Sequence, residues 1–110
     1  MKLRHVGIPV GDLQEAIQFY QQFDFYPLSF ESVEIAGGVV EIAKLAHKEG
    51  SVIELIDGAT AIPHISITTG RLLFEVLKEH RDTKKFKKDG VCYIEDPWGN
   101  IIEIVEERGF

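Results

Sequence analysis

Hydrophobic and polar residues alternate along two short stretches near the middle of the chain, both within residues 51–70. A period of two is typical of β-strands, whose successive side chains point to opposite faces of a sheet. Each stretch has one apolar face, while the other face carries an ionisable side chain, Glu54 in the first stretch and His64 in the second. Because a buried ionisable group needs a partner, a shared metal ion is the first hypothesis to test.

The same alternation continues at the N-terminus, where residues 3–10 place Val6, Ile8 and Val10 on one face and His5 on the other. This pattern predicts a strand with one face suited to packing under a helix. Two further strands are predicted in the first half of the chain, at residues 26–35 and 39–47, and the strand that contains Glu54 is expected within residues 51–57.

A helix is predicted to follow the first strand. Asp12 is a suitable N-cap, and Glu15 has the spacing of a capping box. The apolar residues after the cap recur at helical spacing and should pack on the strands: Leu13, Ala16, Ile17, Tyr20 and Phe23. The first half is therefore predicted to be β-α-β-β-β.

Glycine-containing turns should connect these strands. Gly37-Gly38 is typical of a hairpin turn, and residues 48–50 are typical of a three-residue hairpin loop. With that loop length, Lys44 lies opposite Glu54 on the same face, where it would bind an anionic substrate or pair with the carboxylate. A register shift of one residue would instead leave Lys44 in solvent.

The second half of the chain repeats the first. The segment that starts at His5 aligns without gaps on the one that starts at His64, and the strand containing Glu54 aligns on the one containing Glu103. A second helix is expected at residues 71–80. Strands are expected around Phe86 and at residues 91–96 and 100–106. Such a repeat predicts two similar sheets, each with a helix on one face.

Two histidines and two glutamates occupy equivalent positions of the repeat and form a candidate four-ligand set: His5, Glu54, His64 and Glu103. A single such residue in a strand is more often structural, but four at equivalent positions would be an unusual coincidence. Imidazole nitrogens and carboxylate oxygens suit a divalent ion such as Ni, Zn, Co, Mn or Fe(II). An octahedral ion would keep two positions open for substrate oxygens. It would stabilise an ene-diolate formed by proton loss next to a carbonyl, with a carboxylate as base.

Size and charge limit the other functions. The chain has 110 residues, enough for one domain, and a net charge of −6, which argues against nucleic-acid binding. Cys92 is the only cysteine, which excludes an intrachain disulfide and favours a reducing compartment. Because the sequence has neither a membrane-length apolar run nor the pattern of a signal peptide, we expect a cytoplasmic protein.

Four segments, HVGIPVGDLQEAIQFY, SVIELID, HISIT and DPWGNIIEIVE, resemble the vicinal oxygen chelate superfamily. That superfamily includes glyoxalase I, bleomycin-resistance proteins, extradiol dioxygenases and methylmalonyl-CoA epimerase. The resemblance covers essentially the whole chain, residues 1–110. It implies a single α+β domain of paired βαβββ modules, about 1–58 and 61–110. Their mixed sheet curls around a metal-binding cup, and the helices lie on the outer face.

The resemblance also implies roles for the candidate residues. The four ligands match those of glyoxalase I most closely, in which the residue equivalent to Glu103 is the base and the one equivalent to Glu54 can share that role. We therefore expect a metal-dependent lyase or isomerase that acts on a small molecule, as a homodimer with two metal sites at its interface. Further residues are expected to line the substrate pocket: Lys44, Ser66 and Tyr93.

Two departures from glyoxalase I keep other functions open. Pro9 stands where that enzyme usually has an arginine that binds a glutathione carboxylate, and the segment at residues 31–38 is short. One alternative is a non-catalytic binding protein of the bleomycin-resistance type, which would leave four ionisable side chains without a metal. The other is an Fe(II) extradiol-type dioxygenase, whose His-His-Glu triad would make Glu54 superfluous.

Overall fold

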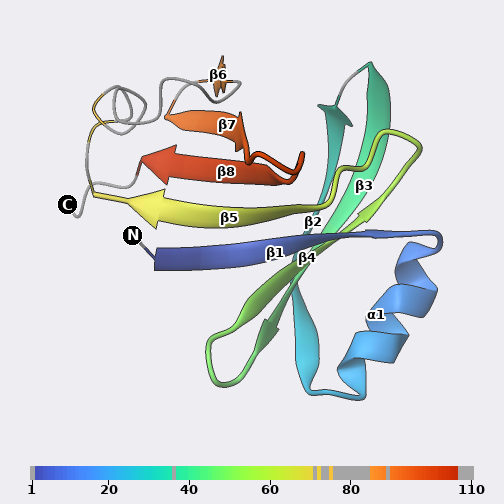
Figure 1. Cartoon of the computed structure of the whole chain (residues 1–110). Helices are drawn as coiled ribbons and strands as arrows, with labels where there is room; N and C mark the ends of the chain where they lie inside the picture. Colours follow the sequence, from blue (N-terminus) through green and yellow to red (C-terminus); the bar gives the residue numbers. More distant parts are fainter. Residues whose placement is uncertain are drawn as a thin grey trace. The chain divides into compact units, whose positions relative to one another are not determined.

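The computed structural model describes residues 2–35, 37–70, 72, 75, 85–88 and 90–106. The chain forms two compact units. The N-terminal unit comprises His5–Pro63, and the C-terminal unit comprises Met1–Arg4 and His64–Phe110. The first strand, β1 (Lys2–Val10), contributes residues to both units (Figure 1).

The N-terminal unit has the predicted β-α-β-β-β order (Figure 1). After β1 its elements are α1 (Leu13–Gln21), β2 (Phe25–Ile35), β3 (Gly38–His47) and β4 (Val52–Asp57). The strands are arranged in the order β2-β3-β4-β1. Strands β1 and β4 are parallel, whereas β2–β3 and β3–β4 are antiparallel pairs. The sheet is therefore mixed, as expected for an α+β module.

Besides the first residues of β1, the C-terminal unit contains four described strands. They are β5 (His64–Thr69), β6 (Lys85–Lys88), β7 (Val91–Glu95) and β8 (Ile101–Glu106). Their order is β5-β8-β7-β6, with β5 and β8 parallel and the other pairs antiparallel. These strands and the α+β class are confirmed. The helix predicted at residues 71–80 lies outside the described residues, apart from Leu72 and Glu75.

Strand register confirms the internal repeat residue by residue. In the N-terminal unit Gly7 pairs with Glu54, and in the C-terminal unit Ser66 pairs with Glu103. Ser66 follows His64 by the same two positions that separate Gly7 from His5. Glu54 and Glu103 therefore occupy equivalent places in two sheets whose strands pair in the same way.

Helix α1 covers one face of the N-terminal sheet. Asp12 is its N-cap, and Asp12 Oδ1 accepts a hydrogen bond from the Glu15 backbone N–H at 3.0 Å. The helix buries Ile17 against Leu45 and Leu55 of neighbouring strands. Because side chains alternate along β4, Glu54 lies on the face opposite Leu55.

The prediction that Phe23 packs on the strands is wrong, since this side chain is exposed. Helix α1 ends at Gln21, so Phe23 is no longer on the helical stripe, and its ring contacts Phe19 instead, with centroids 5.6 Å apart. Asp24 then adopts a left-handed φ of 65° before β2 begins.

Both predicted connections between the strands of the N-terminal unit place glycine at a positive φ, Gly37 at 82° and Gly50 at 102°. The second connection gives the register in which Lys44 pairs with Glu54, which confirms the predicted loop length. Strand β2 alternates poorly in sequence because its register shifts between Pro27 and Ser29, as in a β-bulge.

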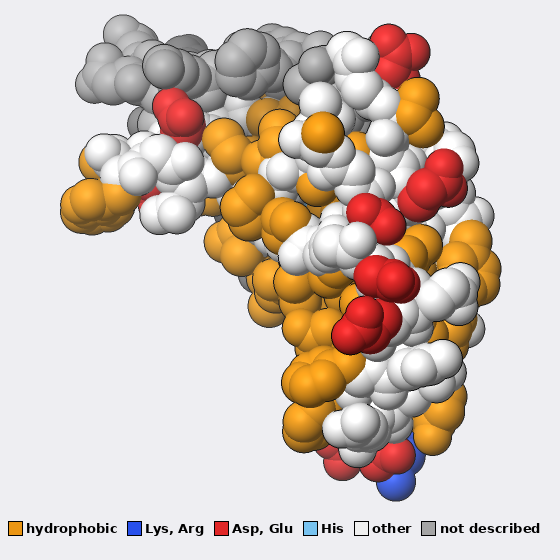
Figure 2. All heavy atoms as spheres, turned by 90° about the vertical axis from the view of Figure 1, so that its right-hand side faces the viewer, with side chains coloured by type: hydrophobic (Ala, Val, Ile, Leu, Met, Phe, Trp, Pro, Cys, Tyr) orange, Lys and Arg blue, Asp and Glu red, His pale blue; other side chains and the backbone are white. Residues whose placement is uncertain are grey.

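Several large apolar side chains of the N-terminal unit are exposed, as Figure 2 shows for one face of the molecule, where hydrophobic side chains gather beside acidic ones. Those from α1, from the connection after it and from β2 are Phe19, Phe23, Tyr26, Leu28 and Phe30. Strand β2 pairs only with β3 among the described strands, so it is an edge strand with an apolar surface.

Candidate metal centre

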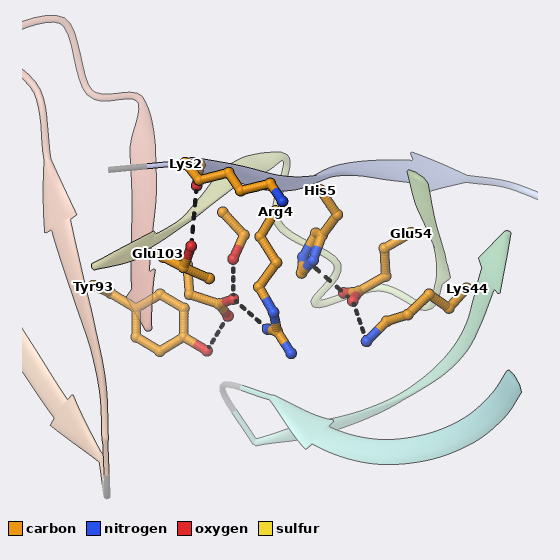
Figure 3. A network of polar contacts seen from close by, with 9 residues as sticks. Lys2, Arg4, His5, Lys44, Glu54, Tyr93 and Glu103 are labelled. Carbon is orange, nitrogen blue, oxygen red and sulfur yellow. Dashed lines mark hydrogen bonds and ion pairs between the residues drawn. The ribbon is translucent and has the colours of Figure 1, made fainter. Parts of the chain in front are cut away.

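The N-terminal unit brings His5 and Glu54 together on the sheet face opposite α1 (Figure 3). His5 Nε2 lies 3.3 Å from Glu54 Oε2, and both residues are buried. Strand pairing explains the contact, because Gly7 is paired with Glu54 and His5, two residues earlier, lies on the same face of β1 as Gly7. Two donor atoms on neighbouring positions of one metal ion are separated by about 3 Å, given metal–ligand bonds of about 2.1 Å. This pair therefore has the spacing of two ligands of one ion.

Lys44 lies beside the same carboxylate. Its Nζ is 4.0 Å from Glu54 Oε2, and its side chain is about a quarter exposed, at 27%. At this distance the contact is a weak ion pair rather than a hydrogen bond. The sequence left two positions for Lys44, beside Glu54 or in solvent, and in the structure Lys44 lies beside the Glu54 carboxylate.

The C-terminal unit surrounds Glu103 with hydroxyl groups (Figure 3). Ser66 Oγ donates a hydrogen bond to Glu103 Oε1 at 2.6 Å, and Tyr93 Oη donates one to Glu103 Oε2 at 2.9 Å. Ser66 is paired with Glu103 across β5 and β8, and Tyr93 is paired with it across β7 and β8. Both carboxylate oxygens are thus held in a fixed orientation by buried or half-buried side chains.

His64 belongs to the same unit and lies close to this carboxylate. One ring nitrogen of His64 and one oxygen of Glu103 are within 4.8 Å of each other. Within each unit, one histidine and one glutamate therefore have donor atoms close enough together to bind the same metal ion. These donor types suit a divalent metal of borderline hardness.

Arg4 was not predicted as a site residue. Its Nη1 lies 3.8 Å from Glu103 Oε1, and its side chain is 41% exposed. Strand alternation gave no signal for this residue, since it places Arg4 and the adjacent His5 on opposite faces. The contact with Glu103 is therefore not one that strand alternation predicts.

A tight turn precedes β8, the strand that carries Glu103. The Gly99 N–H donates to the Asp96 carbonyl at 3.1 Å, which confirms the β-turn predicted from Asp96-Pro97-Trp98-Gly99. The Asp96 carboxylate accepts hydrogen bonds from the Trp98 and Asn100 N–H groups and from the Asn100 side chain. The Asn100 side chain contributes most to holding the pKa of Asp96 below its usual value.

Solved structures similar to this chain share its fold. A variant of methylmalonyl-CoA epimerase from Streptomyces coelicolor, in complex with 2-nitronate-propionyl-CoA, is 17% identical, with 99% of each chain covered and a TM-score of 0.70. A methylmalonyl-CoA epimerase in complex with methylmalonyl-CoA and NH4+ is 16% identical, with 96% of this chain and 94% of the other covered and a TM-score of 0.68.

A mutant of 4-hydroxymandelate synthase from Streptomyces coelicolor is 15% identical, with a TM-score of 0.63. The match covers 99% of this chain but 49% of the synthase. No curated protein sequence matches the chain significantly. Among the described residues, no helix combines the length and the apolar character needed to cross a membrane. The family model for the Glyoxalase/Bleomycin resistance protein/Dioxygenase superfamily matches residues 2–104, and the chain therefore belongs to that superfamily.

Proposed function

We propose that this protein is a metal-dependent isomerase or lyase of the glyoxalase I type, which removes a proton from a carbon next to a carbonyl group. In this proposal two βαβββ modules, one from each chain of a homodimer, line a cup around each divalent ion. The ligands are the four repeat-equivalent residues: His5, Glu54, His64 and Glu103. Membership of the superfamily supports this general class of reaction.

The observation that carries the proposal is the contact between His5 and Glu54. Two buried donor atoms at 3.3 Å have the separation of neighbouring metal ligands, and the repeat provides an equivalent histidine and glutamate in the other unit. Burying ionisable groups is costly, and a divalent ion held by this pair would offset part of that cost. When bound, such an ion would stabilise the negative charge that develops on a substrate oxygen.

Glu103 is the proposed base. One of its carboxylate oxygens accepts the substrate proton, while the hydroxyl groups of Ser66 and Tyr93 keep the carboxylate plane oriented toward the substrate. Both hydroxyls would then line the substrate pocket, as we expect for Lys44 on the side of Glu54. The substrate is a small molecule with two adjacent oxygen functions.

Metal analysis of the purified protein tests the proposal. We expect about one Ni, Zn or Co ion per chain in the native protein, and loss of most of this metal in a variant that combines His5→Ala and His64→Ala. Replacing His47, the last residue of β3 and not a proposed ligand, provides the matched control and should leave the metal content unchanged.

The alternatives predict different results from the same measurement. Iron together with oxygen uptake would favour a dioxygenase. A protein that binds drugs of the bleomycin type but no metal, before and after supplementation, would favour the resistance-type function. A screen of thiol hemiacetals, acyl-CoA thioesters and catechols would then narrow the substrate class.

The proposal also includes a homodimer. Edge strand β2 carries exposed apolar side chains, and such surfaces often mark contacts with another protein chain. In the glyoxalase I arrangement each site combines modules from different chains. Light scattering that shows a metal-loaded monomer at micromolar concentration would rule out this arrangement.

A further inference from the structure

We infer that Arg4 binds an anionic group of the substrate, a carboxylate or a phosphate, next to Glu103. This inference rests on the proposed function, because it places the substrate at the carboxylate that acts as base. It narrows the substrate class to molecules in which an oxyanion lies a few bonds from the reacting carbon.

The contact between Arg4 and Glu103 is weaker than the other contacts of this carboxylate. At 3.8 Å it is an ion pair that lacks a hydrogen bond, whereas Ser66 and Tyr93 donate hydrogen bonds at 2.6 and 2.9 Å. Glu103 is therefore already oriented by hydroxyl groups, and Arg4 is not needed to hold it.

The guanidinium of Arg4 retains most of its donor capacity. An arginine side chain offers five N–H donors, and the ion pair with Glu103 is the one polar contact of this side chain among the residues that the structure describes. The side chain is 41% exposed, so the remaining donors are accessible to a ligand. Charge explains the preference for an anion, because a guanidinium binds carboxylate or phosphate oxygens in a planar, bidentate geometry.

Arg4 lies next to two proposed site residues, where its charge would contribute to substrate selection. Arg4 directly precedes His5 in β1, and it contacts the glutamate of the other half of the repeat. The N-terminal unit has its own cation beside Glu54, but that lysine carries a single ammonium group with no planar fork. Arg4 is thus the better suited of these two cations to bind an oxyanion of fixed orientation.

The test compares three hydroxamates that chelate metals through the same two oxygens. Acetohydroxamate has no second charge, succinate monohydroxamate adds a carboxylate, and 3-phosphonopropionohydroxamate adds a phosphonate. Their affinities for the metal-loaded protein are measured by calorimetric titration, for the wild type and for Arg4→Gln, Arg4→Lys and Lys2→Gln. Lys2 is a matched control, because it is an exposed cation on the same strand, two residues before Arg4.

We expect at least one of the charged hydroxamates to bind the wild type about tenfold more tightly than acetohydroxamate. Whichever of the two gains more affinity shows whether the site prefers a carboxylate or a phosphate group. Arg4→Gln should remove this gain and leave acetohydroxamate affinity unchanged, Arg4→Lys should retain part of it, and Lys2→Gln should retain all of it. Increasing salt should reduce the gain in the wild type.

Three results would overturn the inference. The first is no gain from either charged arm in the wild type, and the second is a gain that persists in Arg4→Gln. The third is an equal loss of all three affinities in Arg4→Gln, which would mean that Arg4 only supports Glu103. If acetohydroxamate does not bind the metal-loaded wild type at all, the proposed substrate site itself is wrong, a failure that differs from each of these three.

Discussion

Glu54 and Glu103 occupy equivalent places in the two units, yet they have different neighbours. Their side chains are exposed to a similar extent, 11% and 13%, so burial does not distinguish them. Glu54 contacts nitrogen groups, those of His5 and Lys44. Glu103 accepts hydrogen bonds from two hydroxyl groups in addition to its ion pair with an arginine.

The difference follows from single substitutions within one shared backbone pattern. Opposite Glu54 stand Gly7 and Lys44, and at the equivalent places opposite Glu103 stand Ser66 and Tyr93. Glycine offers no side chain to the carboxylate, whereas serine offers a hydroxyl. The repeat therefore determines where each carboxylate lies, and the paired residues determine what each can do. We assign metal binding to both and base chemistry to the one that hydroxyl groups orient.

Replacing Tyr93 with phenylalanine should have the largest effect on this comparison outside the four ligands. The change removes the hydrogen bond to Glu103 Oε2 and leaves the ring in place. Because a hydrogen bond to a charged group is worth about 1.5 to 3 kcal/mol, we expect turnover to fall about tenfold or more, with metal content unchanged. Steady-state kinetics and metal analysis measure both quantities.

The matched control for this variant is Tyr20→Phe, which removes the hydroxyl of a half-buried tyrosine in α1 that packs on the other face of the sheet. It should not change turnover. Equal turnover of Tyr93→Phe and the wild type would show that Glu103 does not depend on the Tyr93 hydroxyl. The hydroxyl partners would then not explain why Glu103, rather than Glu54, is the base.

A smaller effect, of opposite sign, is expected in the N-terminal unit. Lys44→Met removes a cation 4.0 Å from Glu54 and keeps most of the apolar stem. A partly exposed ion pair is worth at most about 1 kcal/mol, so metal affinity should increase by no more than about fivefold. Competition titration with a chelating dye measures this affinity.

Lys48→Met, in the exposed β3–β4 loop, is the control for this charge change and should have no effect. If Lys44→Met raises KM while metal affinity stays constant, Lys44 binds substrate rather than competing for the carboxylate. In that case a cation would bind substrate beside the glutamate in both units, Lys44 beside Glu54 and Arg4 beside Glu103.

The smallest expected effect concerns the turn that leads into β8. In Asp96→Asn the charge that accepts three hydrogen bonds is lost, so the melting temperature should fall at neutral pH. The pKa of Asp96 is lowered in the folded protein, so its stabilising contribution is present above the unfolded-state pKa, near 4, and disappears as the pH falls through the lower folded-state pKa.

Thermal unfolding of Asp96→Asn and the wild type between pH 2.5 and pH 7 should therefore show a difference that is constant above about pH 5 and shrinks below about pH 4. A difference that grows toward low pH would have the wrong sign for this carboxylate. A constant difference over the whole range would show that the Asp96 charge does not stabilise the turn.

The sequence predicted most of the fold because its signals are local. Alternation, the Asp12 cap and the glycine turns each depend on residues close in sequence, and the predicted loop length gave the correct pairing of Lys44 with Glu54. The exposure of Phe23 was not predicted, because the spacing of apolar residues continues past the point where the helix ends.

The side-chain contacts of the site were harder to predict. Ser66 and Tyr93 were expected near the substrate, but their hydrogen bonds to Glu103 depend on side-chain conformations that alternation does not specify. Arg4 was missed because alternation assigns it and His5 to opposite faces of β1, and a contact with Glu103 does not follow from that assignment. A long cationic residue next to a candidate ligand is the signal that would have indicated it.

The most direct test of the central claim is to compare Glu103→Gln with Glu54→Gln, measuring turnover on the substrate and metal content in the same preparations. Losing a general base typically costs about 10²- to 10⁴-fold in rate. We expect that loss for Glu103→Gln with metal content only partly reduced, and a smaller loss for Glu54→Gln, whose amide oxygen can still coordinate. Near-full turnover of Glu103→Gln together with an inactive Glu54→Gln would reverse the roles, and unchanged metal binding and activity in both would contradict the four-ligand site.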